Sequence, residues 1–362
     1  MKNYPMVKLG DVCEKGSSSI AQKDIELNEG EYPIYGASGK IKNVDFFKQD
    51  KEYIAIVKDG AGIGRTMLLP AYSSVIGTMQ YILPKENVLA KYLYHAITAM
   101  NLAKYFSGAT IPHIYFKDYK NEKLPLPNKP TQAEIVKLFD KIIALISKRK
   151  EQLSKLDELA KSRFIEMFGD VKESRPLCEL VEFLSRGKAP KYVDGSSVKV
   201  INQACIYWDQ IKYENIKFND ENRISNDAII YDYDLLINST GTGTLGRCNM
   251  FTRKDRSTYV ADSHVTIIRV KSDLINSYYL KSFFSLVYTQ NELYRKCVNG
   301  STNQIELSKE KLLKFKIKTP PINMQLEYSY FVQQLDKSKF RIKKSLEKLE
   351  MTYKALLQEY FG

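Results

Sequence analysis

Two glycine-rich motifs are the features of this sequence that most resemble a cofactor site. Gly241–Gly246 reads Gly-Thr-Gly-Thr-Leu-Gly after a predicted strand, and Gly60–Gly64 reads Gly-Ala-Gly-Ile-Gly after another. In dinucleotide and methyl-donor sites such glycines let the backbone approach the ligand, and the helix that follows offers its positive N-terminus. Here Arg65 and Arg247 instead open segments typical of a second strand. We predict two tight hairpins with these arginines at their far edges; a structural role alone and phosphate binding both stay open.

Signatures of catalysis are missing from the sequence. Thr319–Ile322 reads Thr-Pro-Pro-Ile, which fails at both ends of the Asn/Asp-Pro-Pro-aromatic motif that an adenine methyltransferase needs. Neither a Walker motif nor a G-x-S-x-G elbow occurs. The five cysteines form no C-x-x-C pair, and no two of the three histidines are spaced as metal ligands. We therefore predict a chain that is not an enzyme, with no catalytic residues, no metal and no cofactor.

The charge of the chain indicates the class of its partner. Lys and Arg number 55 against 42 Asp and Glu, and the resulting +13 favours a polyanion, above all nucleic acid, or an anionic membrane surface. A lysine-rich composition without functional meaning is the competing explanation. No apolar stretch is long enough to span a bilayer, and the N-terminus lacks an apolar signal core. We expect a cytoplasmic protein.

Two loops carry short hydrogen-bonding side chains at corresponding places. Ser107–His113 and Asn299–Gln304 are rich in Ser, Thr and Asn, which can bind base edges and phosphates. A helix-to-strand turn selected only for its conformation is the alternative. The candidate DNA-binding residues come from these loops and from basic positions near the glycine motifs: Lys58, Arg65, Ser107, Thr110, His113, Arg247, Arg253, Arg256, Asn299, Ser301, Thr302, Asn303 and Gln304.

Arginine is unevenly distributed. Arg65 is the only arginine of residues 1–130, whereas residues 170–323 hold eight. Because bidentate binding of guanine by Arg is the commonest specific contact to a base, we hypothesise that the second half reads a more guanine-containing element.

An internal repeat sets the organisation of the chain. Arg163–Gly169 reads Arg-Phe-Ile-Glu-Met-Phe-Gly, and Leu356–Gly362 reads Leu-Leu-Gln-Glu-Tyr-Phe-Gly, 193 residues later. Leu124–Pro127 matches Ile317–Pro320 at the same offset, and the order of weaker matches is kept throughout. The sequence therefore predicts one unit written twice, with an internal pseudo-two-fold repeat.

Each copy ends in a long amphipathic pattern. Apolar residues recur at three-to-four spacing over 131–169 and 324–362, Leu145 and Leu159 among them, which predicts two spacer helices packed as an antiparallel coiled coil. Its expected packing residues are Ile135, Ile142, Leu156, Leu335, Ile342 and Leu349. The parts at 1–130 and 170–323 alternate short strand patterns with turns, and each carries one helix, near 87–104 and 273–296. We predict an α+β fold with two similar globular domains and mixed, mostly antiparallel sheets.

The motifs, taken in order, resemble a known family. Ser107–Pro112 (Ser-Gly-Ala-Thr-Ile-Pro), Leu124–Pro127 (Leu-Pro-Leu-Pro) and Thr131–Val136 (Thr-Gln-Ala-Glu-Ile-Val), together with the duplicated plan, are similar to the specificity subunit of a type I restriction-modification enzyme. The resemblance covers the whole chain. The family more usually has Glu before the Gln of the last motif, whereas Thr131 and Met324 stand there in this chain.

The resemblance implies a sequence-specific DNA-binding subunit. Each globular domain would be a target recognition domain that reads one half of a bipartite sequence in double-stranded DNA, and the helices would fix the unread spacer. Two methylation subunits would dock on the helices, and restriction subunits would complete the complex, an adenine-N6 methyltransferase and ATP-dependent endonuclease. The alternative is a stand-alone DNA-binding protein or a scaffold whose partner enzymes are lost.

Overall fold

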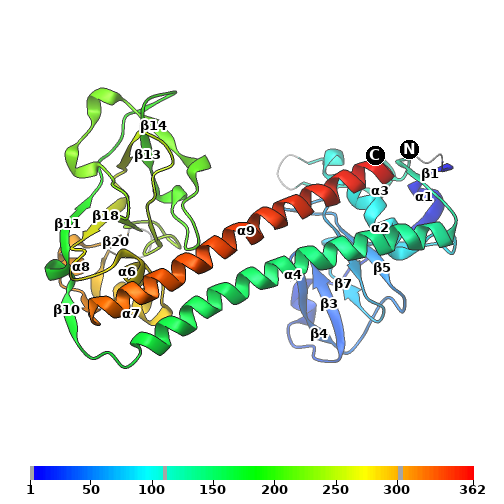
Figure 1. The fold of residues 1–362 in the computed structure, drawn as a ribbon. Coiled ribbons are helices and arrows are strands. Elements are labelled where there is room, and N and C mark those ends of the chain that lie inside the picture. The colour runs from blue at the N-terminus through cyan, green and yellow to red at the C-terminus, as the bar shows by residue number, and fades with distance from the viewer. Residues whose placement is uncertain (1–3, 109–111, 301–304) are drawn as a thin grey trace. The chain divides into compact units, whose positions relative to one another are not determined.

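The computed structural model describes residues 4–108, 112–300 and 305–362. The chain forms two compact units, one made of Met1–Glu151 with Ile342–Gly362 and the other of Gln152–Arg341. Each unit combines sheets, short helices and half of each of two long helices (Figure 1). The predicted α+β class is confirmed. Among the described residues, no helix joins the length and the apolar character that a membrane crossing requires.

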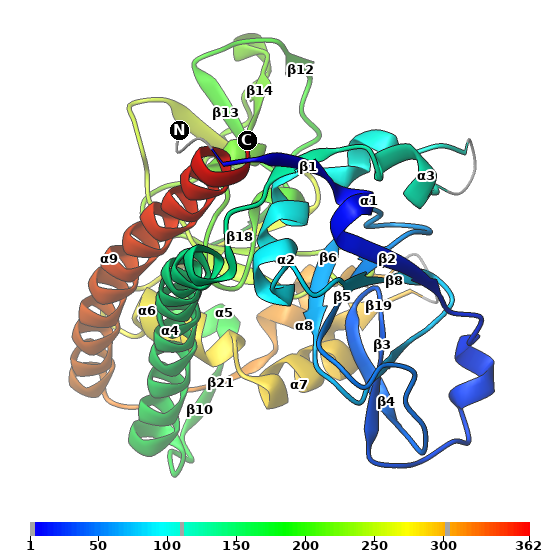
Figure 2. The ribbon, with the colours of Figure 1, turned by 90° about the vertical axis from the view of Figure 1, so that its right-hand side faces the viewer.

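The first unit is built on an antiparallel sheet of order β2-β8-β5-β6. Its central strand β5 (Tyr53–Val57) is buried along its whole length, which explains its unbroken apolar sequence. Helix α2 (Ala90–Ala99) packs against β5 and β6 (Figure 2). The other elements are β1 (Met6–Lys8), α1 (Leu9–Val12), β2 (Cys13–Ser17), β3 (Tyr32–Gly36), β4 (Gly39–Val44), β6 (Thr66–Leu69), β7 (Ser74–Val75), β8 (Met79–Pro84), α3 (Phe116–Tyr119) and β9 (Lys123–Pro125).

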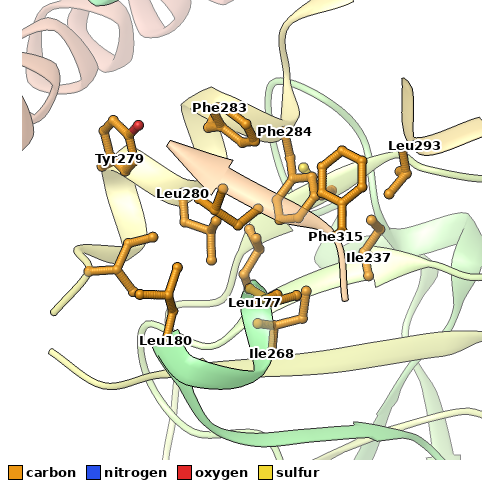
Figure 3. Packing of buried hydrophobic residues seen from close by; sticks show 14 of the residues in the cluster. Leu177, Leu180, Ile237, Ile268, Tyr279, Leu280, Phe283, Phe284, Leu293 and Phe315 are labelled. Atoms are coloured by element: carbon orange, nitrogen blue, oxygen red, sulfur yellow. The ribbon is translucent and has the colours of Figure 1, made fainter. Parts of the chain in front are cut away.

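The second unit has a sheet of order β11-β18-β15-β16 with the same antiparallel pairing. Leu177, Ile237, Ile268 and Phe284 meet in its core (Figure 3). The predicted single helix near 273–296 is two helices, α6 (Ser277–Phe284) and α7 (Val287–Cys297). The remaining elements are β10 (Ser174–Pro176), α5 (Leu177–Leu180), β11 (Val181–Arg186), β12 (Tyr192–Val193), β13 (Val198–Ile201), β14 (Lys217–Asn219), β15 (Leu235–Asn238), β16 (Cys248–Met250), β17 (Thr258–Ala261), β18 (Val265–Val270), β19 (Val298–Asn299), β20 (Glu306–Leu307), α8 (Lys309–Leu313) and β21 (Lys316–Lys318).

A smaller sheet accompanies the main one in each unit. In the first unit, β3 pairs antiparallel with β4 and parallel with β7. In the second unit, β13 pairs antiparallel with β14 and parallel with β17, and β12 extends the sheet beyond β14. The chain connects β3 to β4 through Ala37 and Ser38, whereas residues 202–216 connect β13 to β14.

The long helices α4 (Lys129–Phe168) and α9 (Ile322–Phe361) run antiparallel within each unit. In the first unit the ring of Phe139 lies 5.6 Å from that of Tyr353, and Lys150 pairs with Glu350 at 3.2 Å. In the second unit Arg163 pairs with Glu327 at 3.0 Å, at the other end of both helices.

The side chains predicted to pack between the helices differ in burial. Ile135, Ile142 and Leu335 are buried, whereas Leu156, Ile342 and Leu349 are half-buried. Leu145 and Leu159, which share the same periodic pattern, are each 47% exposed. The apolar pattern of these helices therefore extends beyond the surface that is buried within the chain.

A buried glutamine fastens each long helix to the rest of its unit. Gln132 is fully buried; its Oε1 accepts the N–H of Leu89, at the start of α2 (2.9 Å), and its Nε2 donates to the carbonyls of Asn87 (3.1 Å) and Pro127 (2.8 Å). The buried amide therefore satisfies one backbone donor and two backbone acceptors.

The second unit contains the same arrangement. Gln325 is fully buried, and its Oε1 accepts the N–H of Asn276, at the start of α6 (2.8 Å). Its Nε2 donates to the carbonyls of Leu274 (3.3 Å) and Pro320 (2.8 Å). We call this set of three bonds the glutamine clamp.

Replacement of either clamp glutamine is expected to destabilise its unit. Gln132→Met or Gln325→Met removes the partners of one backbone donor and two backbone acceptors, so the free energy of unfolding should fall by about 3 kcal/mol. Gln132→Glu should be at least as damaging, because a carboxylate offers no donor to the two carbonyls. Thermal or urea unfolding measures the loss, with the exposed Gln334→Glu of α9 as control. Equal stability of Gln132→Glu and this control would contradict the clamp.

A buried histidine makes the first unit sensitive to acid. The ring of His95 in α2 stacks on Phe139 of α4 at 4.4 Å, and its Nδ1 lies 3.3 Å from the hydroxyl of Tyr353 in α9. Burial lowers the pKa of His95 to about 4, because a charged ring is poorly solvated there. The imidazole is therefore neutral when the unit is folded at pH 7.

Stability should fall as the pH drops from about 6.5, the usual pKa of an unfolded histidine, toward 4, because only the unfolded chain takes up the proton in that range. The linkage amounts to about 2 kcal/mol at pH 5. His95→Gln should reduce the difference in unfolding free energy between pH 7 and pH 5 by that amount, measured by denaturant unfolding at both pH values. An undiminished difference would assign the acid sensitivity to other groups.

Candidate nucleic-acid interface

Both glycine motifs form hairpins, as predicted. Gly60–Gly64 lies between β5 and β6, and Gly241–Gly246 between β15 and β16, and each pair of strands is antiparallel. A strand follows each motif where a nucleotide site needs a helix, so the arrangement does not fit a dinucleotide or methyl-donor site. Gly64 has φ +77°, and a Cβ there would lie 2.5 Å from the backbone nitrogen of Ala103. Glycine is thus required both by conformation and by close approach.

In the first unit the loop near Ser107 lies against the glycine hairpin. Gly60 donates its N–H to the carbonyl of Pro112 at 3.0 Å, and the backbones of Ser107 and His113 exchange two hydrogen bonds of 2.8 Å. Two regions that are far apart in the sequence therefore form one surface, which contains Lys58 and His113. Arg65, at the end of the glycine hairpin, is exposed.

Asp59 holds the basic groups of this surface. Its carboxylate accepts from Lys58 Nζ at 2.6 Å and from His113 Nδ1 at 2.7 Å. Partial burial raises the pKa of Asp59, but the hydrogen bonds from Lys58 and His113 outweigh it and leave the pKa below its usual value. Lys58 and His113 are therefore oriented by an acidic residue that sequence reasoning did not single out.

The second unit repeats the juxtaposition with other residues. The hairpin β19–β20 adjoins the glycine hairpin, because Leu307 donates its N–H to the carbonyl of Ser239 at 2.8 Å. Arg186 pairs with Glu306 at 3.1 Å and donates to the carbonyl of Leu307, also at 3.1 Å. Asn299 lies in β19, which follows α7 directly and pairs antiparallel with β20.

The candidate residues are not all brought together. Exposed Asn299 accepts from Lys311 Nζ at 2.6 Å, and Arg247 lies with its guanidinium carbon 5.5 Å from the centre of the Tyr207 ring. Exposed Arg253 and Arg256 follow β16, at the end opposite Arg247. The predicted candidates Thr110, Ser301, Thr302, Asn303 and Gln304 lie outside the described residues.

Some residues of these surfaces gave little signal in the sequence. Asp59 contacts His113, Arg186 contacts Glu306 and Lys311 contacts Asn299, and no local sequence pattern indicates these pairs. Tyr207 and the neighbouring Trp208 were identifiable, since Trp208 is the one tryptophan of the chain and lies in a turn-rich segment.

Within the described ranges, no three His, Cys, Asp or Glu side chains lie close enough to hold a metal ion. Burial raises the pKa of Cys205 to about 11 and that of Cys248 to about 12, which disfavours the reactive thiolate. The geometry at the hairpins suits polar and ionic binding to a polyanion.

Comparison with known proteins agrees with this interpretation. A family model described as type I restriction modification DNA specificity domain matches residues 1–156 and 170–351. The chain belongs to this family. It is 23% identical to the type I restriction enzyme MjaVIII specificity subunit of Methanocaldococcus jannaschii, over 98% of this chain and 91% of that protein. The expected function is therefore DNA target recognition.

Solved structures share the fold of this specificity-domain protein. The crystal structure of the type I restriction-modification S subunit from M. genitalium superposes with a TM-score of 0.61 at 15% identity, over 99% of this chain and 96% of that one. A chain from a study of complex assembly and conformational transition of the type I R-M system gives 0.56 at 15% identity, over 100% and 98%.

The glycine hairpin of the first specificity domain should tolerate alanine unequally. Gly60→Ala meets only the conformational cost of φ +83°, about 1 kcal/mol, because nothing lies within 4 Å of the added carbon. Gly64→Ala adds a backbone clash with Ala103, so its loss of unfolding free energy should exceed that of Gly60→Ala by at least about 2 kcal/mol. Denaturant unfolding of both variants measures the difference; equal losses would mean that the two segments do not approach so closely.

Proposed function

We propose that this chain is the DNA-reading subunit of a type I restriction-modification complex and contributes no chemistry of its own. Residues 1–130 and 170–323 act as two target recognition domains, each of which reads one half of a bipartite sequence in double-stranded DNA. The observation that carries the proposal is the duplicated pairing of a glycine hairpin with a second loop, in units that share one sheet order and one glutamine clamp.

The repeat is supported by the positions of corresponding bonds. Gln132 and Gln325 are 193 residues apart, as are their partners Pro127 and Pro320. The buried tyrosines of α2 and α6 add a second pair, because Tyr92 donates to the carbonyl of Pro125 and Tyr279 to that of Lys318, each at 2.8 Å. Two domains that share one arrangement of strands and helices but differ in their loops are suited to read two different half-sites of DNA.

The helices at 131–169 and 324–362 form the spacer as an antiparallel coiled coil. A helix of 40 residues is about 60 Å long, which exceeds the roughly 20 Å of a six-base-pair spacer. Two methylation subunits dock on the helices, supply the methyl-donor site and flip the target adenine out of the DNA, and restriction subunits complete the complex. Large apolar side chains left exposed on the helices support this docking: Ile143, Leu145, Leu159, Ile165, Leu326, Tyr330, Phe340 and Met351.

Co-expression with the methylation subunit encoded beside it should produce N6-methyladenine at a bipartite motif with a fixed spacer. Exchange of residues 1–130 for another recognition domain should change one half of the motif and leave the other half and the spacer unchanged, because each domain reads independently. Single-molecule sequencing of the host genome measures this.

A continuous motif, or a motif unchanged by the exchange, would contradict the proposal. Absence of methylation despite an intact partner subunit would leave a stand-alone DNA-binding protein or a scaffold.

A further inference from the structure

The arginines that follow the two glycine hairpins have different neighbours. Arg65 donates from Nη1 to the carbonyl of Ala37 at 3.0 Å, in the two-residue connection between β3 and β4. Arg247 lies against the ring of Tyr207, in the fifteen-residue connection between β13 and β14. These two connections correspond, because β3 and β13 pair with their neighbours in the same way. The second domain thus replaces a carbonyl by an aromatic ring beside the same arginine.

Hydrogen bonds fix the backbone at Tyr207, and its ring contacts two cations, because Lys212 Nζ lies 4.1 Å from the ring centre and the Arg247 guanidinium carbon 5.5 Å from it. Tyr207 donates its N–H to the carbonyl of Gln210 at 3.0 Å. The side chain of Asn249, a buried residue of β16, donates to the carbonyls of Tyr207 at 2.8 Å and Trp208 at 3.4 Å. Arg247 immediately precedes β16, so the same segment of chain positions both partners of this contact.

The backbone of Arg247 is fixed by hydrogen bonds, whereas the N–H groups of its guanidinium remain available as donors. Its N–H donates to the carbonyl of Thr244 at 3.1 Å, and its carbonyl accepts from Asn238 at 2.8 Å. Its side chain is half-buried, and its contact with Tyr207 is a cation–π contact. Among the described residues, the guanidinium makes no hydrogen bond or ion pair, so its planar fork is available to a ligand.

We propose that Arg247, oriented by the ring of Tyr207, determines specificity for one guanine in the half-site bound by residues 170–323. A guanidinium that rests on an aromatic face keeps its N–H edge free, and that edge matches the O6 and N7 acceptors of guanine in the major groove. Tyr207 is a positioning residue. Arg65 differs, because a backbone carbonyl already takes one of its donors. The inference rests on the proposed DNA recognition.

Mapping of N6-methyladenine after co-expression with the methylation subunit tests the assignment. The unchanged chain should give a second half-site that contains a G·C pair. Arg247→Ala should lower the preference for that base pair about tenfold and leave the other half-site and the spacer intact. Arg247→Lys keeps the charge but not the fork, so it should relax the same position; it also keeps the test available if the alanine variant does not accumulate.

Substitutions of Tyr207 distinguish a role of its ring in positioning Arg247 from a role in folding of the domain. Tyr207→Phe keeps the aromatic face and should keep the guanine, whereas Tyr207→Ala should relax the same single position as Arg247→Ala. Arg175→Ala, at an exposed arginine of β10 paired with Glu173, is the matched control and should leave the motif unchanged.

The outcomes distinguish this inference from the proposed function. A bipartite motif in the unchanged chain that Arg247→Ala does not alter, or whose second half lacks guanine, overturns the role of Arg247 alone. Uniformly weaker methylation of an unaltered motif identifies a phosphate contact and also overturns it. Absence of any bipartite motif in the unchanged chain contradicts the proposed function instead.

Discussion

Each unit depends on one buried carboxamide that joins two segments of chain through three hydrogen bonds. The buried side chains of Gln132 and Gln325 each bind one backbone N–H and two backbone carbonyls. Few side chains can replace them: Asn is shorter, Glu has no donor, and Lys has no acceptor. The bonds tie the start of a long helix to the start of α2 or α6, so the orientation of the sheet on its helix follows from them. The residues before the glutamines, Thr131 and Met324, make none of these bonds.

Sequence reasoning succeeded where local chemistry determines the structure. The glycine hairpins could be predicted because positive φ angles and flanking strand patterns are local properties, and the helices because their period extends over some forty residues. The two helices α6 and α7 were predicted as one because their apolar pattern continues across Ser285 and Leu286. The side-chain amide of Gln290 donates to the carbonyl of Phe284, at the end of α6, and to that of Gly246, in the glycine hairpin. The junction between α6 and α7 is therefore fixed against the hairpin by a bond between residues 44 positions apart.

The candidate site was less predictable, because several of its side chains contact partners that are distant in sequence, as Asp59 contacts His113. Lys58 reads as a free basic residue, yet Asp59 already holds it together with His113. The neighbour of Arg247 differs from that of Arg65 because the connection between β13 and β14 is longer than that between β3 and β4. No periodic pattern in the sequence predicts the path of this connection. Composition could indicate that the second half favours guanine, but the choice of Arg247 among eight arginines needed the position of the Tyr207 ring.

The sheet register explains how recognition can vary while assembly stays constant. In the first unit Val57 pairs with Met79, at the end of β5 that leads into the glycine hairpin, whereas β8 runs away from that end toward Leu89 and the clamp. The second unit has the same register, since Asn238 pairs with Val265 and β18 then leads to Asn276. A strand of six residues, about 20 Å, therefore separates the hairpin from the clamp. Loops at the hairpin end can change length and charge, as the second domain shows at Tyr207, while the bonds that orient the domain on its helix stay intact.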